Sequence, residues 1–183
     1  MIILEGPDGS GKTTLLNKLT KEFDLPVAEK SVDSSTKART DLKRYTEDTI
    51  NAGLQRMIFD RHPVISEPIY AAAIRHTVKE GFDSMGWLTG QLVKLNRFRP
   101  FIIYCLPPLK TVAENVYNSP VMQPESVLEK IDVIWGAYAA LAARQVSVGS
   151  AVVHDYTVDG SDLRISMMLR NWLGAQPWNG SQR

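Results

Sequence analysis

Short apolar runs alternate along the chain with longer segments whose apolar residues recur every three to four positions. Each run stops at a charged residue, histidine, glycine or proline, which is typical of buried strands in a parallel sheet. The runs predict strands at 2–4, 27–28, 57–59, 101–106 and 151–153. The amphipathic segments predict helices at 12–23, 41–51, 67–79, 85–96, 111–117, 125–141 and 163–173.

Two prolines bear on the third of these helices. Pro63 and Pro68 together predict a loop at 63–66, with Ser66 as the N-cap of the helix that follows and Gly81 just beyond its end. Strands alternating with helices predict an α/β fold with a doubly wound, mainly parallel sheet flanked by helices. We expect one domain over 1–173 and a polar tail at 174–183.

The carboxyl ends of the strands are where such a sheet binds ligands. The glycine-rich segment after Leu4 and the Asp60-Arg61 pair after Phe59 both fall at this edge. The sequence therefore predicts that they share one site.

Composition narrows the class of protein without identifying it. The chain has 183 residues, 44% of them hydrophobic and 22% charged, and a net charge of +1, so no general attraction to nucleic acid or anionic membrane is expected. The single cysteine, Cys105, excludes an internal disulfide and suits a reducing compartment. We find no membrane-spanning or signal-like stretch and expect a soluble, cytoplasmic protein.

Residues 6–13 read Gly-Pro-Asp-Gly-Ser-Gly-Lys-Thr and match the phosphate-binding P-loop pattern, with a predicted strand before it and a helix after it. Glycines let backbone N–H groups surround phosphate oxygens, and the helix N-terminus adds its dipole. Lys12 is expected to bridge the β- and γ-phosphates of ATP, and the Thr13 hydroxyl to bind Mg²⁺. The predicted ATP-binding residues are Gly6, Gly9, Ser10, Gly11, Lys12, Thr13 and Thr14.

The segment after the predicted strand at 57–59 supplies the other candidate residues. Asp60 can hold Mg²⁺ or accept a proton from an incoming nucleophile, and Arg61 can clamp an acceptor. With Lys12 they form the predicted catalytic set. Glu67 and Tyr70 follow and can contact an acceptor sugar or base, although capping or solvation explains each of them equally well.

These residues resemble the thymidylate kinase and deoxynucleoside kinase group of P-loop kinases. The resemblance rests on Ile3 to Thr14, on Asp60-Arg61-His62, and on the strand from Arg99 to Pro108. It implies a P-loop NTPase fold of the nucleotide-kinase type with a five-stranded, mainly parallel sheet and a lid at about 117–123. It also implies that Asp8 contacts the acceptor deoxyribose and that Arg61 grips the acceptor.

The sequence departs from that group where an acceptor phosphate would bind. Thymidylate kinases carry a catalytic arginine in the phosphate loop or in the lid, and neither Pro7–Ser10 nor 117–123 contains one. The group's Arg-Glu-Pro element is also absent from the region of Ala28–Ser31. A monophosphate acceptor brings two negative charges beside ATP, so the absence of these arginines weakens the hypothesis that dTMP is the acceptor.

The stretch from Asp60 to Tyr70 also resembles compact bacteriophage P-loop kinases that phosphorylate the hydroxymethyl group of 5-hydroxymethyluracil in DNA. A hydroxyl acceptor would use Asp60 as base and needs fewer arginines. Basic clusters at 37–44, which includes Arg39, and at 94–99 can contact a phosphate backbone, or simply form solvated helix faces.

Three hypotheses follow from the sequence. The first is an ATP- and Mg²⁺-dependent kinase acting on a thymine-type hydroxyl, best represented by 5-hydroxymethyl-dU in phage DNA, in which case the location is the host cytoplasm. The second is a kinase for dTMP or another deoxynucleoside monophosphate, and the third is a nucleotide-binding switch ATPase. The predicted acceptor-binding residues are Asp8, Arg61, Glu67, Tyr70 and Arg39, and the oligomeric state stays open, a homodimer being one alternative.

Overall fold

A four-stranded parallel sheet forms the centre of the protein in a computed structural model that describes residues 1–28, 42–52, 56–75, 85–120 and 123–175. The strands are β1 (Ile2–Glu5), β2 (Ile58–Asp60), β3 (Phe101–Cys105) and β4 (Ala151–His154). They lie in the order β2-β1-β3-β4, and every neighbouring pair is parallel. The predicted α/β class with a parallel sheet is therefore confirmed.

The predicted five-stranded sheet is wrong for the described residues. At the expected fifth strand, Val27 forms a single parallel bridge with Ile58, and no ladder follows it up to residue 28, where the described segment ends. Pro26 precedes this bridge and has no N–H with which to extend the pairing, although its carbonyl accepts a hydrogen bond from Ile58. Among the described residues, this single bridge is the only pairing on the outer side of β2.

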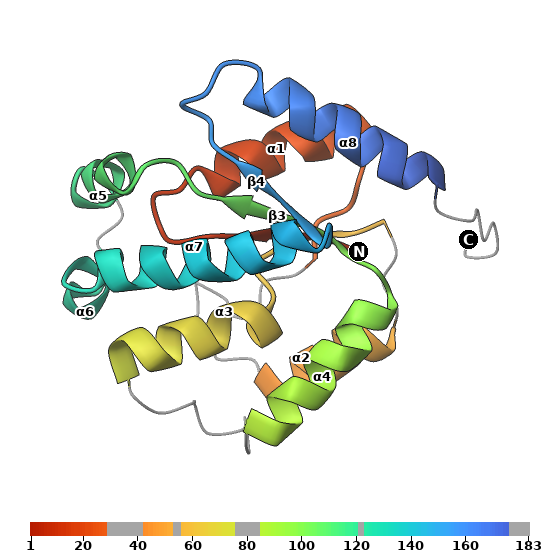
Figure 1. Ribbon diagram of the computed structural model, residues 1–183, viewed down its shortest axis with the longest axis horizontal. Helices are drawn as coiled ribbons and strands as arrows, with labels where there is room; N and C mark the ends of the chain where they lie inside the picture. The colour runs from red at the N-terminus through yellow and green to blue at the C-terminus, as the bar shows by residue number, and fades with distance from the viewer. Residues whose placement is uncertain (29–41, 53–55, 76–84, 121–122, 176–183) are drawn as a thin grey trace.

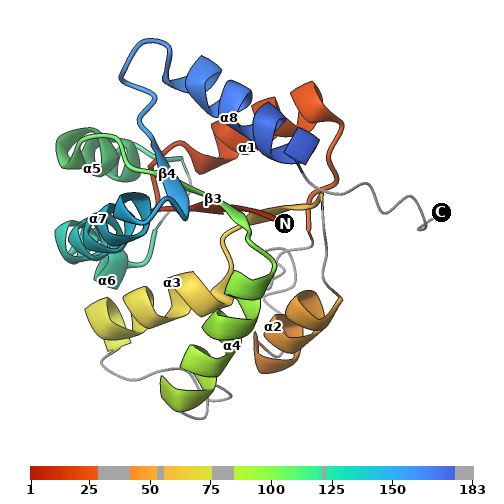
Figure 2. The same cartoon turned by 45° about the vertical axis from the view of Figure 1, so that its right-hand side comes forward.

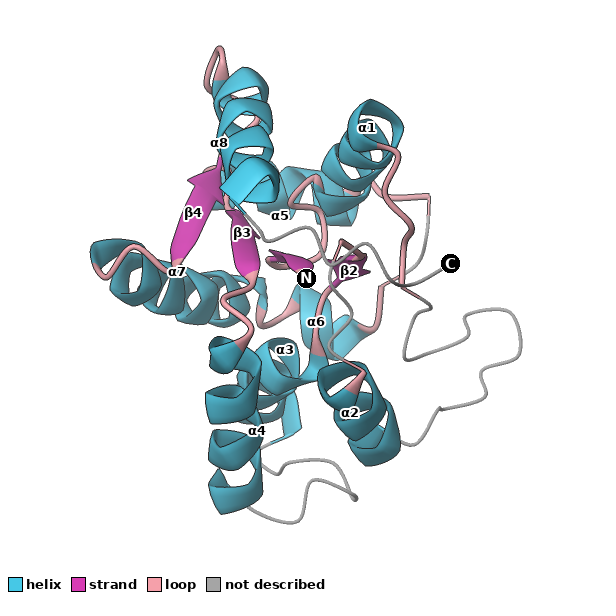
Figure 3. Cartoon of the chain, turned by 90° about the vertical axis from the view of Figure 1, so that its right-hand side faces the viewer, coloured by secondary structure: helices cyan, strands magenta, loops and turns pink. Residues whose placement is uncertain are grey.

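Helices cover both faces of the sheet (Figures 1 and 2). On one face lie α1 (Lys12–Phe23) and α8 (Ser161–Ala175), and on the other α3 (Pro63–Tyr70) and α7 (Ile131–Ser147). Two further helices, α2 (Leu42–Asn51) and α4 (Met85–Arg97), pack beyond α3, as the end view in Figure 3 shows. Beside the carboxyl ends of the strands, α5 (Leu109–Tyr117) and the short α6 (Glu125–Leu128) complete the described helices.

The alternation of side chains along β1 separates two hydrophobic cores. Ile2 and Leu4 face α1 and α8, where they join a buried cluster that includes Leu19 and Ile165. Met1 and Ile3 face the opposite side and join the cluster formed with α3 and α7. Both faces of β1 are buried, which explains why the strand reads as a continuous apolar run in the sequence.

The start of α3 differs from the prediction. We expected a loop at 63–66 and a helix after Ser66, but α3 begins at Pro63 with His62 as its N-cap. A proline is tolerated in the first helical turn because the N–H that it lacks has no partner there. Pro68 lies inside the helix, which changes to a π-helical turn, η1 (Ala71–Arg75), directly after Tyr70.

Two predicted boundaries lie at or beyond the ends of described helices. The polar tail was expected from Gly174, but α8 extends through Ala175, and 176–183 lie outside the described residues. The lid predicted at about 117–123 begins at the last residue of α5 and includes 121–122, which are not described, so it stays a prediction. Within the described chain, no helix is long and apolar enough to cross a membrane.

Gly6 provides a test of how tightly β1 leads into the following loop. Its φ is +140°, and a Cβ atom there would lie 2.4 Å from the carbonyl oxygen of Cys105 on β3. We expect Gly6→Ala to lower the free energy of unfolding by about 3 kcal/mol or more, because backbone strain and a backbone clash add together. Urea unfolding measures this loss.

Gly149 is the matched control, because it also has a positive φ, of +71°, but no atom lies within 4 Å of the added Cβ. Gly149→Ala should cost only about 1 kcal/mol, the usual penalty of the left-handed conformation. Equal losses in the two variants would show that the contact with Cys105 is not a constraint.

Candidate functional site

The predicted phosphate loop connects β1 to α1 at the carboxyl edge of the sheet. Gly11 is the N-cap of α1, so the first backbone N–H groups of the helix point toward the loop. Ser10 and Lys12 are buried, whereas Thr13 and Thr14 in the first helical turn are exposed. The structure thus has the strand–loop–helix context that the sequence motif requires.

The ammonium group of Lys12 lies inside the loop. Nζ donates hydrogen bonds to the carbonyl oxygen of Gly6 at 2.9 Å, to that of Pro7, and to Oγ of Ser10 at 3.3 Å. Burial, together with the positive charge of Arg61, lowers the pKa of Lys12 to about 8. An anion in this loop would reverse that effect, since a negative charge favours the protonated amine.

Asp8, Arg61 and Tyr70 form a closed hydrogen-bonded triangle, here called the acceptor cluster after the role expected from the sequence. Nη2 of Arg61 donates to Oδ1 of Asp8 at 2.9 Å and to the hydroxyl of Tyr70 at 2.8 Å, and that hydroxyl donates to Oδ2 of Asp8 at 2.9 Å. The guanidinium carbon of Arg61 also lies 5.1 Å from the centre of the Tyr70 ring. Three of the predicted acceptor-binding residues therefore meet in one place.

The carbonyl oxygen of Gly6 connects the acceptor cluster to the phosphate loop. It accepts hydrogen bonds from Nε and Nη2 of Arg61 at 3.2 and 3.1 Å, in addition to the one from Lys12. Burial alone would raise the pKa of Asp8, but Arg61 and Lys12 hold it below its ordinary value. Asp8 is consequently a carboxylate, and its charge balances that of Arg61.

The remaining predicted residues occupy different positions. Asp60 is the last residue of β2, pairs in register with Leu4 and is half-buried. Glu67 is buried on α3, one turn before Tyr70. Arg39 lies outside the described residues.

The residues suggested for Mg²⁺ are Thr13 and Asp60. In the described part of the chain, no group of three or more His, Cys, Asp or Glu side chains gathers in a way that could hold a metal ion. Mg²⁺ commonly takes only one or two protein oxygens and fills its shell with nucleotide phosphates and water. One hydroxyl and one carboxylate at the same sheet edge fit that requirement.

Glu5 is a site residue to which sequence analysis assigned no role. It ends β1 and is fully buried, with Oε1 accepting the backbone N–H of His62 at 2.7 Å and Oε2 accepting the hydroxyl of Tyr138 at 3.2 Å. Burial raises the pKa of Glu5 to about 7, although these hydrogen bonds and Arg61 oppose the shift. A charged residue that ends an apolar central strand was the only signal in the sequence.

His62 is buried beside this carboxylate. Its Nε2 lies 3.2 Å from Oγ1 of Thr49, and burial lowers the pKa of the ring to about 4. The imidazole is therefore neutral at physiological pH. Its Nδ1 accepts the backbone N–H of Val64 in capping α3, so His62 acts as an anchor for the helix that carries Tyr70.

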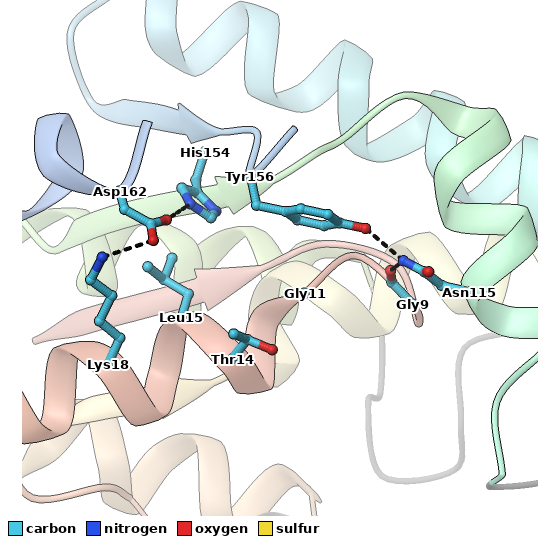
Figure 4. A pocket seen from close by; sticks show the side chains of 9 residues that line it. All are labelled: Gly9, Gly11, Thr14, Leu15, Lys18, Asn115, His154, Tyr156 and Asp162. Carbon is cyan, nitrogen blue, oxygen red and sulfur yellow. Dashed lines mark hydrogen bonds and ion pairs between the residues drawn. The ribbon is translucent and has the colours of Figure 1, made fainter. Parts of the chain in front are cut away.

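A pocket of about 330 Å³ adjoins the other side of the phosphate loop (Figure 4). This volume lies at the lower end of the range of about 300–1,000 Å³ found for small-molecule sites. Its walls come from the loop, α1, α5, the end of β4 and the start of α8. The lining residues are Gly9, Gly11, Thr14, Leu15, Lys18, Asn115, His154, Tyr156 and Asp162.

Asn115 and Tyr156 close one end of this pocket. Nδ2 of Asn115 donates to the carbonyl oxygen of Gly9 at 2.8 Å and to the hydroxyl of Tyr156 at 2.6 Å. The Tyr156 ring lies against Gly11, where an added Cβ would come within 2.9 Å of it. Neither residue was singled out in the sequence, because they come from segments about 100 and 145 residues beyond the loop.

The opposite end of the pocket carries three polar side chains. Asp162 accepts a hydrogen bond from Lys18 at 2.8 Å, and its other oxygen lies 2.6 Å from Nε2 of His154. His154 is 2% exposed, and its Nδ1 has no hydrogen-bond partner in the described structure. Polar side chains thus lie at both ends of the pocket, whereas most of its surface is apolar.

Solved structures with the same fold include a Bacillus subtilis protein and an M. mycoides kinase. The Bacillus subtilis YorR protein, solved in complex with phosphorylated GDP, matches with a TM-score of 0.66 and 20% identity, over 96% of this chain and 98% of that one. Mycoplasma mycoides deoxyadenosine kinase with bound dCTP matches with a TM-score of 0.60 and 18% identity, over 94% of this chain and 100% of that one. The same kinase with bound dATP gives 0.57 and 16%, over 93% and 98%.

The sequence itself matches no protein-family model and no curated protein. The structural likeness extends over nearly the full length of both chains, so it concerns the whole domain. At 16–20% identity it establishes the fold: an α/β domain with a parallel sheet flanked by helices, as in the deoxynucleoside kinase.

The raised pKa of Glu5 predicts a specific pH dependence of stability. Its pKa is about 7 in the folded protein and near 4.5 when unfolded, so the folded state binds more protons between these values. The contribution of Glu5 to the free energy of unfolding therefore falls as pH rises from about 4.5 to 8. One pKa unit corresponds to about 1.4 kcal/mol, so the total change is a few kcal/mol at most.

Comparison with Glu5→Gln isolates this contribution, because His62 titrates with the opposite sign, its pKa being lowered in the folded state. Urea unfolding at several pH values should show the wild type losing stability relative to Glu5→Gln as pH rises. Parallel curves would mean that Glu5 is ionised throughout.

Proposed function

We propose that this protein is an ATP- and Mg²⁺-dependent phosphotransferase. The observation that carries the proposal is the different surroundings of two consecutive residues of the phosphate loop. Asp8 contacts Arg61 and Tyr70 in the acceptor cluster, whereas Gly9 lines the pocket and accepts a hydrogen bond from Asn115. The two sides of the loop therefore differ chemically, and we assign the side of the pocket to a donor nucleotide and the side of the acceptor cluster to an acceptor.

The donor side uses the pocket and the loop together. The base of ATP would occupy the pocket against Tyr156, and its phosphates would reach the loop past Gly11 and the N-terminus of α1. Lys12 would exchange the carbonyl oxygens of Gly6 and Pro7 for β- and γ-phosphate oxygens. Mg²⁺ held by Thr13, and by Asp60 through water so that its carboxylate can still accept a proton, would neutralise the phosphate oxygens. The deoxyadenosine kinase solved with bound dATP and with bound dCTP supports nucleotide binding by this fold.

The acceptor is a neutral hydroxyl group in this proposal. The charge of Arg61 is already balanced by Asp8 at 2.9 Å, and neither Pro7–Ser10 nor 117–123 contains another arginine. A dianionic phosphate beside Asp8 would be repelled, but a sugar or hydroxymethyl group can hydrogen-bond to the cluster. Asp60 takes the proton of the attacking hydroxyl, the oxygen bonds to the γ-phosphorus, and the bond to the β–γ bridging oxygen breaks to release ADP.

The specific acceptor that we propose is the hydroxymethyl group of 5-hydroxymethyl-dU in DNA. The stretch from Asp60 to Tyr70 that resembles the phage kinases contributes two of the three members of the acceptor cluster. Contact with the DNA backbone would use Lys94 and Arg97 on α4, because the positive charges of the neighbouring α2 are offset by Glu47 and by Asp48, which pairs with Arg44 at 3.5 Å. A free deoxynucleoside is the second candidate, because one structural neighbour is named a deoxyadenosine kinase and a deoxynucleoside also offers a hydroxyl group.

An acceptor comparison tests the proposal. Transfer of labelled γ-phosphate from ATP is measured with duplex DNA containing 5-hydroxymethyluracil, 5-hydroxymethyl-dUMP, dTMP, thymidine and deoxyadenosine. We expect label in the DNA, with activity that falls steeply with salt because backbone contacts are screened. Label in a nucleoside alone would support a hydroxyl acceptor but contradict the proposal that the acceptor lies in DNA. Label in dTMP would contradict the proposal that the acceptor is a neutral group.

Two variants serve as controls for this assay. Lys12→Ala should abolish transfer to every acceptor. Asp60→Asn should lower transfer at least about 100-fold while ATP binding is nearly retained, because the loss concerns proton acceptance and metal binding more than the loop. ATP hydrolysis without any labelled acceptor would favour a nucleotide switch.

The donor pocket has its own test. Tyr156→Ala should weaken ATP binding about tenfold or more, since contact of a base with an aromatic ring contributes about 1–3 kcal/mol. Tyr156→Phe keeps the ring, loses the hydrogen bond to Asn115, and should bind ATP almost as the wild type does. Isothermal titration gives the Kd for ATP of both variants. An unchanged Kd in Tyr156→Ala would show that the base of ATP does not bind in this pocket.

A further inference from the structure

We propose that Glu5 and Tyr138 are positioning residues that hold Arg61 in place for phosphoryl transfer. The inference rests on the proposed phosphotransferase function, because it assigns Arg61 to the acceptor. Neither Glu5 nor Tyr138 lies within the predicted motifs for ATP or acceptor binding, and both are completely buried.

The backbone of Arg61 needs support. Its φ is +68°, a left-handed conformation that costs a residue with a side chain about 1 kcal/mol or more. The end of β1 holds this turn on both sides: the N–H of Arg61 donates to the carbonyl of Leu4 at 2.9 Å, and the next N–H, that of His62, donates to Glu5 at 2.7 Å. The carboxylate thus fixes the direction in which the Arg61 side chain leaves the strand.

Tyr138 holds the second oxygen of the Glu5 carboxylate in place. Its hydroxyl donates to Oε2 of Glu5, so the two oxygens of Glu5 have different partners and the group cannot rotate freely. Tyr138 belongs to α7, which is remote in sequence from β1 and from Arg61. Its ring also packs edge-on against that of Tyr70, with 6.4 Å between the ring centres.

These contacts make α7 a common support for the acceptor cluster. Through Glu5 it restrains the backbone of Arg61, and through the ring of Tyr70 it restrains the hydroxyl that bonds Arg61 and Asp8. Small errors in such positioning slow a reaction far more than they weaken binding, because the reacting groups must be aligned closely. We therefore expect a loss in kcat and little change in the KM for ATP.

Tyr138→Phe and its matched control Tyr104→Phe test this inference. Tyr104 is equally buried, lies beside Tyr138 with ring centres 6.4 Å apart, and donates one hydrogen bond, to Gln145 at 3.1 Å. Each variant loses one hydroxyl group and should lose similar stability. Only Tyr138→Phe should lower kcat, by about tenfold, with the KM for ATP unchanged.

Glu5→Gln provides a second arm. The amide still accepts the N–H of His62 but loses the negative charge, so kcat should again fall about tenfold, and the double variant with Tyr138→Phe should fall little further because both changes break one link. Equal losses of kcat in Tyr138→Phe and Tyr104→Phe, or an unchanged kcat in Tyr138→Phe, would overturn the inference.

A measurement without turnover separates this inference from the proposed function. The Nε–H resonance of Arg61, assigned by its loss in Arg61→Lys, should shift or broaden in Tyr138→Phe and stay in place in Tyr104→Phe. If the wild type transfers phosphate to no acceptor but this resonance responds as expected, the function is wrong and the positioning of Arg61 holds. An unaltered Arg61 resonance in Tyr138→Phe refutes the positioning whether or not phosphate is transferred.

Discussion

The carbonyl oxygen of Gly6 accepts hydrogen bonds from both Lys12 and Arg61, and the arrangement of the whole site depends on this shared acceptor. It brings the side chains of Lys12 and Arg61 close together. The pKa of Lys12 is therefore lowered by the positive charge of Arg61 in addition to its burial. Only glycine permits it, because the backbone at this position is pressed against Cys105 on β3. The contact between two neighbouring strands therefore determines how closely the phosphate loop approaches the acceptor cluster.

The parts of the fold that could be predicted are those that depend on patterns within short continuous segments of the sequence. Apolar runs at 2–4, 57–59, 101–106 and 151–153 identified the four strands, and the loop motif at 6–13 identified the strand–loop–helix unit. Parallel pairing then required that the segments after β1 and β2 meet, as they do. The fifth strand is not found among the described residues, because a two-residue run after a proline cannot show whether a ladder continues.

The parts that could not be predicted depend on contacts between distant segments. Glu5 looks like the polar end of a strand until Tyr138, 133 residues later, is seen to donate to it. The pocket likewise combines α1 with Asn115 and Tyr156, which have no motif of their own. The loop predicted at Pro63 was wrong for a local reason, since a proline favours a loop in general but is also suited to the first turn of a helix.

The immediate succession of Asp8 and Gly9 has a consequence for how this site can diversify. Inserting one residue between them would move one side of the loop by up to about 3.8 Å relative to the other and would break the bond of Asp8 to Arg61 or that of Gly9 to Asn115. Loop length is therefore not free to vary. In the proposed kinase, new acceptor preferences would therefore arise by exchanging side chains on α3 and its neighbours, while the loop itself stays the same length.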